Sequence, residues 1–374
     1  MKKSLIALAV LAASGAAMAQ SSVTLYGIAD AWVGSTKVET GAGFRGPLNT
    51  PVAAAGGQRQ TAVNTSGVNG SRWGLKGSED LGGGMKAIFT LESGFSLDTG
   101  ASAQNGTLFS RQAFVGLQSD FGTVSLGRQY SAYDNLQGAT NHNYDAFTFS
   151  ARGAVSANGI KDYANRIDNS IAYTSPSFGG FSGAVVYGFG ENKNAISPVT
   201  GLTTNSDATD SASVHIKYAN GPILVGYAYQ QDKLVGIGAA QDDNKYNLLG
   251  GSYDFGVAKL TGSYNTAKNN VLKDKEGQIG VSVPFGAAAI SVGYARSKSE
   301  GAGVERTGKG VSILGTYALS KRTGLYFGAQ QTKAFVPTAA SAATFTSAAV
   351  AAANLSQVGE TKTTTYGLGV RHSF

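Results

Sequence analysis

The chain has 374 residues and no cysteine, which excludes disulfide bonds, a thiol nucleophile and a zinc–thiolate site. Its 52 glycines follow no collagen-like repeat, and together with 17 tyrosines and 17 phenylalanines they favour many strands over helices. The formal net charge is +7, but the basic residues form neither a clustered basic helix nor a long run. Nucleic-acid binding is therefore not expected, whereas anions, acidic glycans and lipid head groups are suitable partners.

The N-terminus has the pattern of an export signal. Two lysines precede an apolar run over residues 5–13, and Ala17-Met18-Ala19 follows as an A-x-A cleavage site. This pattern predicts a signal peptide over residues 1–19, and the alternative is a buried N-terminal helix. Removal of the two lysines would leave a mature chain, residues 20–374, with a net charge of +5. After the leader, no apolar run approaches the ~20 residues of a spanning helix.

From residue 22 onward, segments of about ten residues alternate apolar and polar side chains, and this is the length of a tilted membrane strand. Successive side chains of a strand point to opposite faces. In the last segment Tyr366, Leu368 and Val370 therefore share one face, and Arg371 lies on the other. In one segment, 181–190, apolar residues occupy both faces and leave its orientation ambiguous. The expected strands are 22–35, 70–80, 84–97, 108–119, 122–130, 166–175, 181–190, 212–220, 222–231, 244–254, 256–267, 276–284, 287–298, 308–319, 323–332 and 363–374.

The connections between these segments alternate between short and long. The short ones have the Gly, Pro, Asn, Asp and Ser chemistry of tight turns and lie at 80–84, 119–122, 176–180, 220–222, 254–256, 284–286 and 320–324. The pattern predicts an all-β, transmembrane, antiparallel up-and-down β-barrel of about 16 strands, with short periplasmic turns and long exterior loops. The alternative is a soluble two-sheet sandwich, although Greek-key connections have no reason to alternate so regularly.

Two further features are compatible with more than one structure. Aromatic residues gather near the ends of the expected strands, as in the interfacial girdles of a barrel, but core aromatics of a sandwich would give part of this pattern. The Ala-, Thr- and Ser-rich stretch 339–353, within the long connection 333–362, fits either a flexible exterior loop or a short helix.

Five segments in consistent order carry a resemblance to a known family: SSVTLYGIADAWVG, SRWGLKGSEDLGGGMKAIFTLESGF, RQAFVGLQSDFGTVSLGRQ, NRIDNSIAYTSPSFGGFSG and YGLGVRHSF. The chain resembles the general porins of beta-proteobacteria over nearly its whole mature length, and the long loops match least. The resemblance implies a barrel in the Gram-negative outer membrane that assembles as a homotrimer, with its third long loop folded into the pore. It also implies that Phe374 is an assembly signal for the barrel-assembly machinery, that lipid and lipopolysaccharide surround the barrel, and that no cofactor is bound.

The candidate constriction loop spans approximately residues 131–165, because this connection follows the fifth expected strand and is among the longest. Its acids Asp134 and Asp145 are expected to face a basic cluster across the pore. The resemblance places three arginines in this cluster, and a fourth is added from its position at the end of the fifth strand: Arg72, Arg111 and Arg166, and then Arg128.

Strand parity supports two of these arginines. Arg72 lies on the face opposite Trp73, and Arg166 on the face opposite Ile167, so both are expected to point inward. Arg111 shares parity with apolar residues, so it requires either a bulge or a position at the rim, and its inclusion depends on the resemblance. The alternative for each arginine is an ordinary solvated charge at the rim. An arginine facing lipid at mid-membrane would cost ~2–4 kcal/mol, so arginines at that depth are expected to face the lumen.

The predicted function is passive diffusion of ions and small hydrophilic solutes, with a preference for anions set by the basic wall. The first alternative is a substrate-specific channel in which Tyr130, Tyr133 and Tyr144 stack on sugars, although loop packing explains the same tyrosines. The second alternative is a soluble exported adhesin or binding protein. Catalysis and metal binding are not expected, because the 3 histidines follow no metal-ligand spacing and no nucleophile motif occurs.

Overall fold

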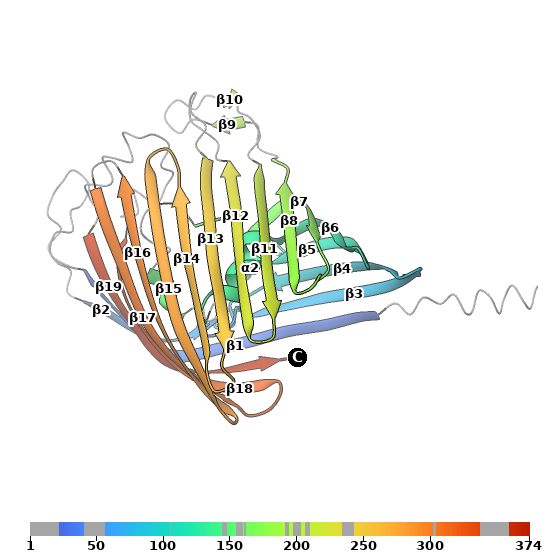
Figure 1. Cartoon of the computed structure of the whole chain (residues 1–374). Helices are drawn as coiled ribbons and strands as arrows, with labels where there is room; N and C mark the ends of the chain where they lie inside the picture. Colours follow the sequence, from blue (N-terminus) through green and yellow to red (C-terminus); the bar gives the residue numbers. More distant parts are fainter. Residues whose placement is uncertain are drawn as a thin grey trace, which may run out of the picture.

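The computed structural model describes residues 22–40, 57–104, 106–143, 148–154, 160, 162–190, 194–196, 203–205, 210–233, 243–301, 304–336 and 359–374. These residues form an antiparallel sheet that closes into a barrel (Figure 1). The expected signal peptide, Asp145, Tyr144 and the stretch 339–353 lie outside the described residues.

The closed sheet contains 17 strands. The first group comprises β1 (Ser22–Thr40), β2 (Gln58–Thr65), β3 (Arg72–Gly82), β4 (Met85–Gly94), β5 (Gln112–Ser119), β6 (Gly122–Tyr130), β7 (Arg166–Thr174) and β8 (Phe181–Gly188). The second group comprises β11 (Ser211–Asn220), β12 (Ile223–Lys233), β13 (Asp243–Asp254), β14 (Lys259–Lys268), β15 (Leu272–Phe285), β16 (Ala288–Gly301), β17 (Val304–Ala318), β18 (Thr323–Val336) and β19 (Gly359–Ser373). A separate hairpin pairs β9 (Asn194–Ile196) with β10 (Thr203–Asn205).

Strand β1 closes the barrel because it pairs along both of its edges. One edge pairs with β19, and the other pairs first with β3 and then, further along, with β2. Since β2 and β3 together occupy one position beside β1, the 17 strands make a wall of 16, as predicted. Strand β2 was not predicted and lies inside the connection that was expected to be a loop.

The strands place their large apolar side chains on the outside of the barrel. On β12, Ile223, Val225 and Tyr227 are exposed, whereas the alternating Ala228 and Gln230 point inward and are buried. The final strand follows the same rule, because Tyr366, Leu368 and Val370 are exposed on its outer face, as predicted. An apolar exterior around a polar interior suits a barrel surrounded by lipid. No helix in the described ranges is long and apolar enough to span a membrane.

The seven predicted short turns lie at one end of the barrel, called here the turn end, and the opposite end is called the loop end (Figure 1). Two connections at the loop end are also short, because β14 ends at Lys268 and β15 begins at Leu272, and β16 ends at Gly301 and β17 begins at Val304. Each predicted short turn joins two consecutive strands. Gly221, Gly256 and Gly286 adopt φ angles of 55°, 81° and 61° in these turns. This left-handed conformation is open to glycine at no steric cost, which explains why glycine marks the turns in the sequence.

Strand β7 departs from simple alternation. Its register with β6 shifts between Gly127 and Gln129, and Asn169 has a φ of 47°. Because an extra residue enters β7 here, Ile167 faces inward and is buried, whereas Ile171 beyond the shift faces outward. The parity argument that Arg166 points inward, because it lies on the face opposite Ile167, therefore fails, since Ile167 is itself the inward residue.

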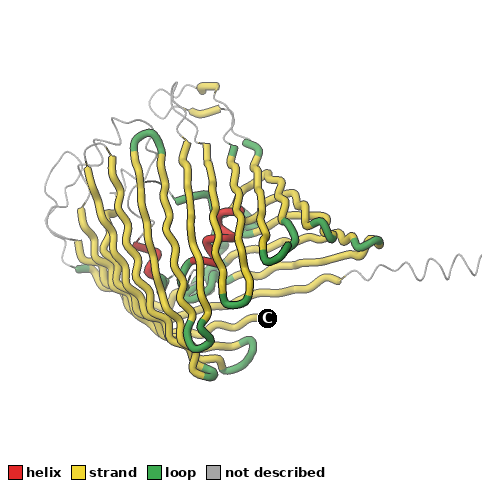
Figure 2. Tube along the Cα trace, in the orientation of Figure 1, coloured by secondary structure: helices red, strands yellow, loops and turns green. Residues whose placement is uncertain are grey.

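The described part of residues 131–165 lies inside the barrel and is called here the inner segment (Figure 2). It begins with α2 (Ala132–Thr140), where Ser131 caps the helix by accepting a hydrogen bond from Asp134 N. A short 3-10 helix, η2 (Ala151–Ala154), follows after the turn of the segment. Helix α2 packs against β11, β12 and β13, and η2 packs against β16, β17 and β18.

Candidate functional site

The inner segment is seated on glycines of the inner wall. A Cβ atom at Gly280 on β15 would lie 2.0 Å from the His142 ring, and one at Gly328 on β18 would lie 2.2 Å from the Phe149 ring. Three other inward glycines lie equally close to the inner segment: Gly226 contacts Leu136, Gly250 contacts Thr140 and Gly293 contacts His142. The missing Cβ atoms therefore allow the segment to approach the wall at van der Waals distance.

Carboxylates of the inner wall hold the returning part of the inner segment. Asp274 on β15 accepts a hydrogen bond from Ile160 N at 2.7 Å, and Asp232 on β12 accepts one from Ala164 N at 2.9 Å. Both aspartates are buried. Hydrogen bonds to a charged acceptor are stronger than neutral ones, so these acids fix the segment while being shielded from the lumen.

The start of the segment is held by a third strand. Tyr133 N donates to Ser213 Oγ at 2.8 Å, and the His215 ring Nδ1 lies 2.7 Å from Ala132 O. Ser213 and His215 are buried inward-facing residues of β11. The helix therefore starts at a position that the wall defines.

The tip of the segment docks on the far wall. The Phe149 ring is fully buried and packs edge-on against Trp32 of β1 and Tyr326 of β18, with ring centroids 5.2 Å and 6.2 Å away. Asp30 supports this contact, because its carboxylate accepts hydrogen bonds from Tyr326 Oη at 2.5 Å and from the backbone N–H groups of residues 67–69. Thr148 in turn donates its hydroxyl to Ser66 O at 3.2 Å.

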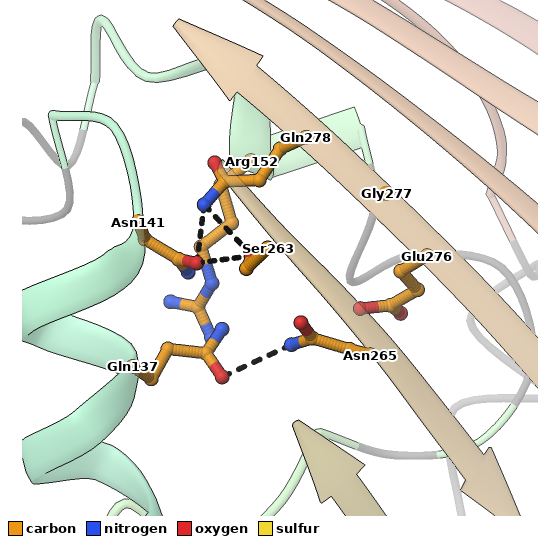
Figure 3. A pocket seen from close by; sticks show the side chains of 8 residues that line it. All are labelled: Gln137, Asn141, Arg152, Ser263, Asn265, Glu276, Gly277 and Gln278. Atoms are coloured by element: carbon orange, nitrogen blue, oxygen red, sulfur yellow. Dashed lines mark hydrogen bonds between the residues drawn. The ribbon is translucent and has the colours of Figure 1, made fainter. Parts of the chain in front are cut away.

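A polar hollow lies between helix α2 and strands β14 and β15 (Figure 3). Gln137 Oε1 accepts a hydrogen bond from Asn265 at 3.0 Å, and Asn141 Oδ1 accepts one from Ser263 at 2.7 Å and a second from Gln278. The Arg152 side chain enters the hollow from η2, and Glu276 lies on its far side (Figure 3). Side-chain amides thus connect the segment to the wall where apolar contacts end.

The opposite wall carries a basic group. Arg111 precedes β5 and is 9% exposed, and its Nε lies 2.7 Å from Glu92 on the inner face of β4. Glu92 also accepts a hydrogen bond from Tyr26 Oη at 3.0 Å. Arg111 therefore faces inward, because it stands just before the regular strand and strand parity does not apply to it.

Tyr130 joins two of the predicted arginines. Its hydroxyl accepts hydrogen bonds from Arg111 Nη2 at 2.5 Å and from Arg166 Nη2 at 2.9 Å, and the Arg166 guanidinium lies 4.6 Å from the ring centroid. Nε of Arg166 is buried and has no hydrogen-bond partner among the described residues. The structure thus brings Arg111 and Arg166 together at the point where the inner segment leaves β6.

Arg72 and Lys76 extend the basic group along β3. Arg72 pairs with Ile28 of β1 in the register and donates to Gly70 O at 2.9 Å. The Lys76 ammonium lies 5.3 Å above the ring of Tyr26, which is an inward residue of β1. Lys76 was not predicted in the cluster, although its parity with Arg72 was sufficient to include it.

Arg128 does not belong to the basic group. It pairs with Ala113 in the β5–β6 register, on the face where Val115 and Leu126 are exposed, and this is the outer face. Its guanidinium forms an ion pair with Asp168, and its Nε donates to Ser110 O at 2.9 Å. The prediction of Arg128 at the pore wall was therefore wrong, because it depended on chain position and not on parity with Leu126.

The acids of the inner segment have partners within the segment. Asp134 is buried and accepts a hydrogen bond from Tyr163 Oη at 2.7 Å, so its opposition to the arginines stays a prediction. Asp162 forms an ion pair with Arg152 at 2.9 Å, and Arg152 was missed in the sequence. Asp145 lies outside the described residues.

Burial shifts two titratable groups of the inner segment. The pKa of His142 falls to about 4 because burial disfavours its charged form, and its Nε2 has no hydrogen-bond partner among the described residues. Desolvation by the enclosing protein raises the pKa of the Asp162 carboxyl although 45% of its side chain is exposed, and the neighbouring Arg152 opposes this shift. Among the side chains in the described ranges, no group of three or more His, Cys, Asp or Glu residues is placed to hold a metal ion.

Comparison with known proteins identifies the family. The model of the Gram-negative porin family matches residues 5–334. The chain belongs to the Gram-negative porins. Outer membrane porin protein 32 of Delftia acidovorans is 35% identical over 339 residues, which cover 87% of this porin and 88% of that protein. An outer membrane porin protein of Bordetella pertussis is 31% identical over 413 residues, covering 100% of both chains.

A solved structure agrees with this barrel. The anion-selective porin from Comamonas acidovorans superposes with a TM-score of 0.71 at 28% identity, covering 95% of this porin and 100% of that chain. The fold predicted from the sequence is therefore confirmed, and the porin is an outer-membrane channel. A soluble sandwich is excluded by the closed barrel.

Proposed function

We propose that this porin passes small hydrophilic solutes by diffusion, without catalysis, and prefers anions at a constriction formed by the inner segment. The supporting observation is an uneven distribution of charge across the interior. Arg72, Lys76 and Arg111 place three cations on the inner wall against the single carboxylate of Glu92, a net charge of +2, and Arg166 joins them at the strand end through Tyr130. Across the interior, Asp232 and Asp274 are buried beneath the inner segment and bind its backbone. A basic wall raises the local concentration of anions.

The test of this proposal is the reversal potential of single channels in asymmetric salt. Replacement of Arg72 and Arg166 by Gln is expected to shift the reversal potential toward cation selectivity, because arginine stays charged at all relevant pH values. The matched control is Lys309→Gln with Lys333→Gln, which removes the same charge from the outer face. An unchanged potential in the arginine variant would contradict the assignment of the basic group.

A substrate-specific sugar channel finds less support. Tyr133 is 1% exposed and packs against Tyr163 and Tyr246 at ring-centroid distances of 4.5 Å and 6.3 Å. Tyr130 is held by Arg111 and Arg166. Neither tyrosine presents a free ring face to the lumen, so loop packing explains them better than sugar stacking. Block of the conductance by a neutral oligosaccharide at micromolar concentration would reverse this preference.

We further propose that the porin assembles as a homotrimer through the outer face of β5–β7. These strands have 8 or 9 residues, against 14 or 15 in β15–β19, so the wall is lower here. The Arg128–Asp168 ion pair also lies on this outer face, where contact with lipid would be unfavourable and a partner subunit would exclude it. A heat-modifiable oligomer that is weakened in Arg128→Ala would agree with this, and a fully monomeric wild type would contradict it.

The two ends of the chain are proposed to act in export and assembly. Residues 1–19 are a cleaved signal peptide, which N-terminal sequencing of the mature porin tests. Phe374 is an assembly signal, and its ring contacts Gly27 while its backbone N–H and C=O groups hydrogen-bond with Gly27 at 3.1 Å and 3.0 Å. Loss of outer-membrane insertion in Phe374→Ala, with normal secretion, is the expected outcome.

A further inference from the structure

Two hollows meet between the inner segment and the wall. The first is the polar hollow beside helix α2 (Figure 3), which holds about 200 Å³ including the solvent at its opening. The second holds about 310 Å³ on the same basis and is lined by the buried rings of Tyr133, Tyr163 and Tyr246. Asn265 on β14 and Glu276 on β15 line both hollows and pair directly in the strand register. The two hollows therefore form one space, called here the side recess.

Among the described residues of the side recess, Glu276 stands out as a carboxylate without a partner. Its side chain is partly exposed, and within the described ranges it forms neither a hydrogen bond nor an ion pair. The acids near it have partners. Asp162 pairs with Arg152 at 2.9 Å, and Asp274 binds the backbone of the inner segment. A carboxylate that leaves bulk water is normally paired with a cation or with hydrogen-bond donors, so Glu276 indicates a positively charged group in the recess.

Hydrogen-bond donors lie across the polar hollow from Glu276. The Arg152 guanidinium enters the hollow from η2, on the side away from Glu276 (Figure 3). Asn141 is 6% exposed, and its Nδ2 has no hydrogen-bond partner in the described part of the chain. Ser263 and Gln278 both donate to Asn141 Oδ1, which fixes the orientation of the amide and identifies the unpaired atom as the donor. A buried donor without an acceptor is costly, so this side of the recess is suited to a negatively charged group.

We propose that the side recess binds a zwitterionic solute of the amino-acid class, with its ammonium group at Glu276 and its carboxylate at Arg152 and Asn141. A molecule with opposite charges at its two ends complements an acceptor on one side and donors on the other. A simple cation or a simple anion would satisfy only one side. Hydrogen bonds between charged groups are stronger than neutral ones, so both ends of the solute contribute to binding.

A zwitterion also suits the rest of the interior. It carries no net charge, so the basic group on the opposite wall does not repel it as it would repel an organic cation. A solute can reach the recess, because the Arg152 side chain is 25% exposed and Glu276 is partly exposed. Such binding goes beyond the proposed diffusion of small solutes. It requires only that the protein is a channel and does not depend on its anion preference.

The test measures the concentration at which a solute halves the single-channel current. Alanine, propionate and ethylammonium are similar in size and carry both charges, the negative charge alone and the positive charge alone. The wild type is expected to be blocked by alanine at a lower concentration than by ethylammonium. Glu276→Gln should raise the half-blocking concentration of alanine at least about tenfold without weakening block by propionate. Arg152→Gln should weaken block by alanine without weakening block by ethylammonium. The matched control, Glu79→Gln, removes an equal charge from an exposed position near the turn end and should be blocked like the wild type.

An unchanged half-blocking concentration of alanine in Glu276→Gln would overturn the proposal, and so would equal block of the wild type by alanine and ethylammonium. Loss of alanine block in the variant that combines Arg72→Gln and Arg166→Gln would also overturn it, because the solute would then bind at the basic group. If heat-modifiable migration shows that Glu276→Gln does not fold, Glu276→Asp replaces it, and undiminished block by alanine there would overturn the proposal equally. Channels that keep their anion preference but are not blocked by alanine would contradict this proposal alone.

Discussion

The two halves of the inner wall use charge and side-chain volume in opposite ways. On β11–β18 glycines and buried carboxylates at inward positions contact the inner segment directly. On β3–β7 the inner wall carries arginines and a lysine that Glu92 neutralises only in part. One half therefore positions a loop, and the other half is available to act on a solute.

This difference explains why the burial of a charged side chain, more than the number of charges, determines the electrostatic field in the lumen. An acid that binds backbone N–H groups beneath a loop adds little to the field in the lumen, whereas an arginine at a wetted wall retains its effect. The porin can thus carry many interior acids and still prefer anions. Variants that alter residues in one half of the inner wall at a time test this comparison.

The largest effect is expected from adding Cβ atoms at the glycines that contact the inner segment. The double variant Gly280→Ala and Gly328→Ala places Cβ atoms 2.0 Å and 2.2 Å from the rings of His142 and Phe149. Overpacking of this kind costs about 1–3 kcal/mol per site, so the segment should move into the lumen. Single-channel recordings should show a lower mean conductance with larger fluctuations.

The matched control is Gly277→Ala on β15, where the nearest atom to a new Cβ is a Tyr264 carbon at 3.9 Å. This variant should conduct like the wild type. Adding Phe149→Leu to Gly328→Ala should restore part of the conductance, because it removes ring atoms from the overpacked site. Normal conductance in the double glycine variant would show that these glycines do not position the segment.

The second effect is weaker binding of the inner segment to the wall at acidic pH, caused by protonation of His142. The pKa is about 4 in the seated segment against an ordinary value of 6.5, so the released segment binds a proton that the seated one does not. The stability of the segment on the wall is unaffected above about pH 6.5, falls as the pH falls toward about 4, and changes no further below that. The total is about 3 kcal/mol, since each pKa unit contributes about 1.36 kcal/mol.

Conductance fluctuations recorded from pH 7 to pH 4 measure this effect. In His142→Asn the pH dependence should disappear from this interval. The variant His372→Asn, which changes an exposed histidine on the outer face of β19, should keep it. A pH response that is the same in the wild type and in His142→Asn would assign it to another group.

The smallest effect concerns the other half of the wall. Lys76→Gln removes one charge near the lumen, which contributes about 0.4 kcal/mol at ~10 Å in water and less at high salt. The reversal potential should shift slightly toward cation selectivity at low salt. Lys245→Gln, which removes an equal charge from the outer face, should leave it unchanged, and equal shifts in both variants would indicate that total charge sets the selectivity.

The arginines show how far strand parity extends as a guide to the site. Arg72 lies where its parity with Lys76 placed it, because β3 is regular between them. Arg111 stands outside the regular strand, so it could not be oriented by counting. Arg166 adjoins the inward Ile167, so alternation alone places it on the outer face, and its hydrogen bond to Tyr130 connects it with Arg111. Arg128 could have been oriented, since its parity with the exposed Leu126 already indicated the outer face.

The sequence by itself determined the strand number, the turns and the lipid-facing residues of the barrel. These features are local, because side-chain alternation and turn chemistry act over a few residues. Tertiary structure alone decided which arginines meet at Tyr130 and which glycines receive the inner segment. Each of these depends on the register between strands or on a bulge. A contact between residues far apart in the chain leaves no periodic signal in the sequence around either residue.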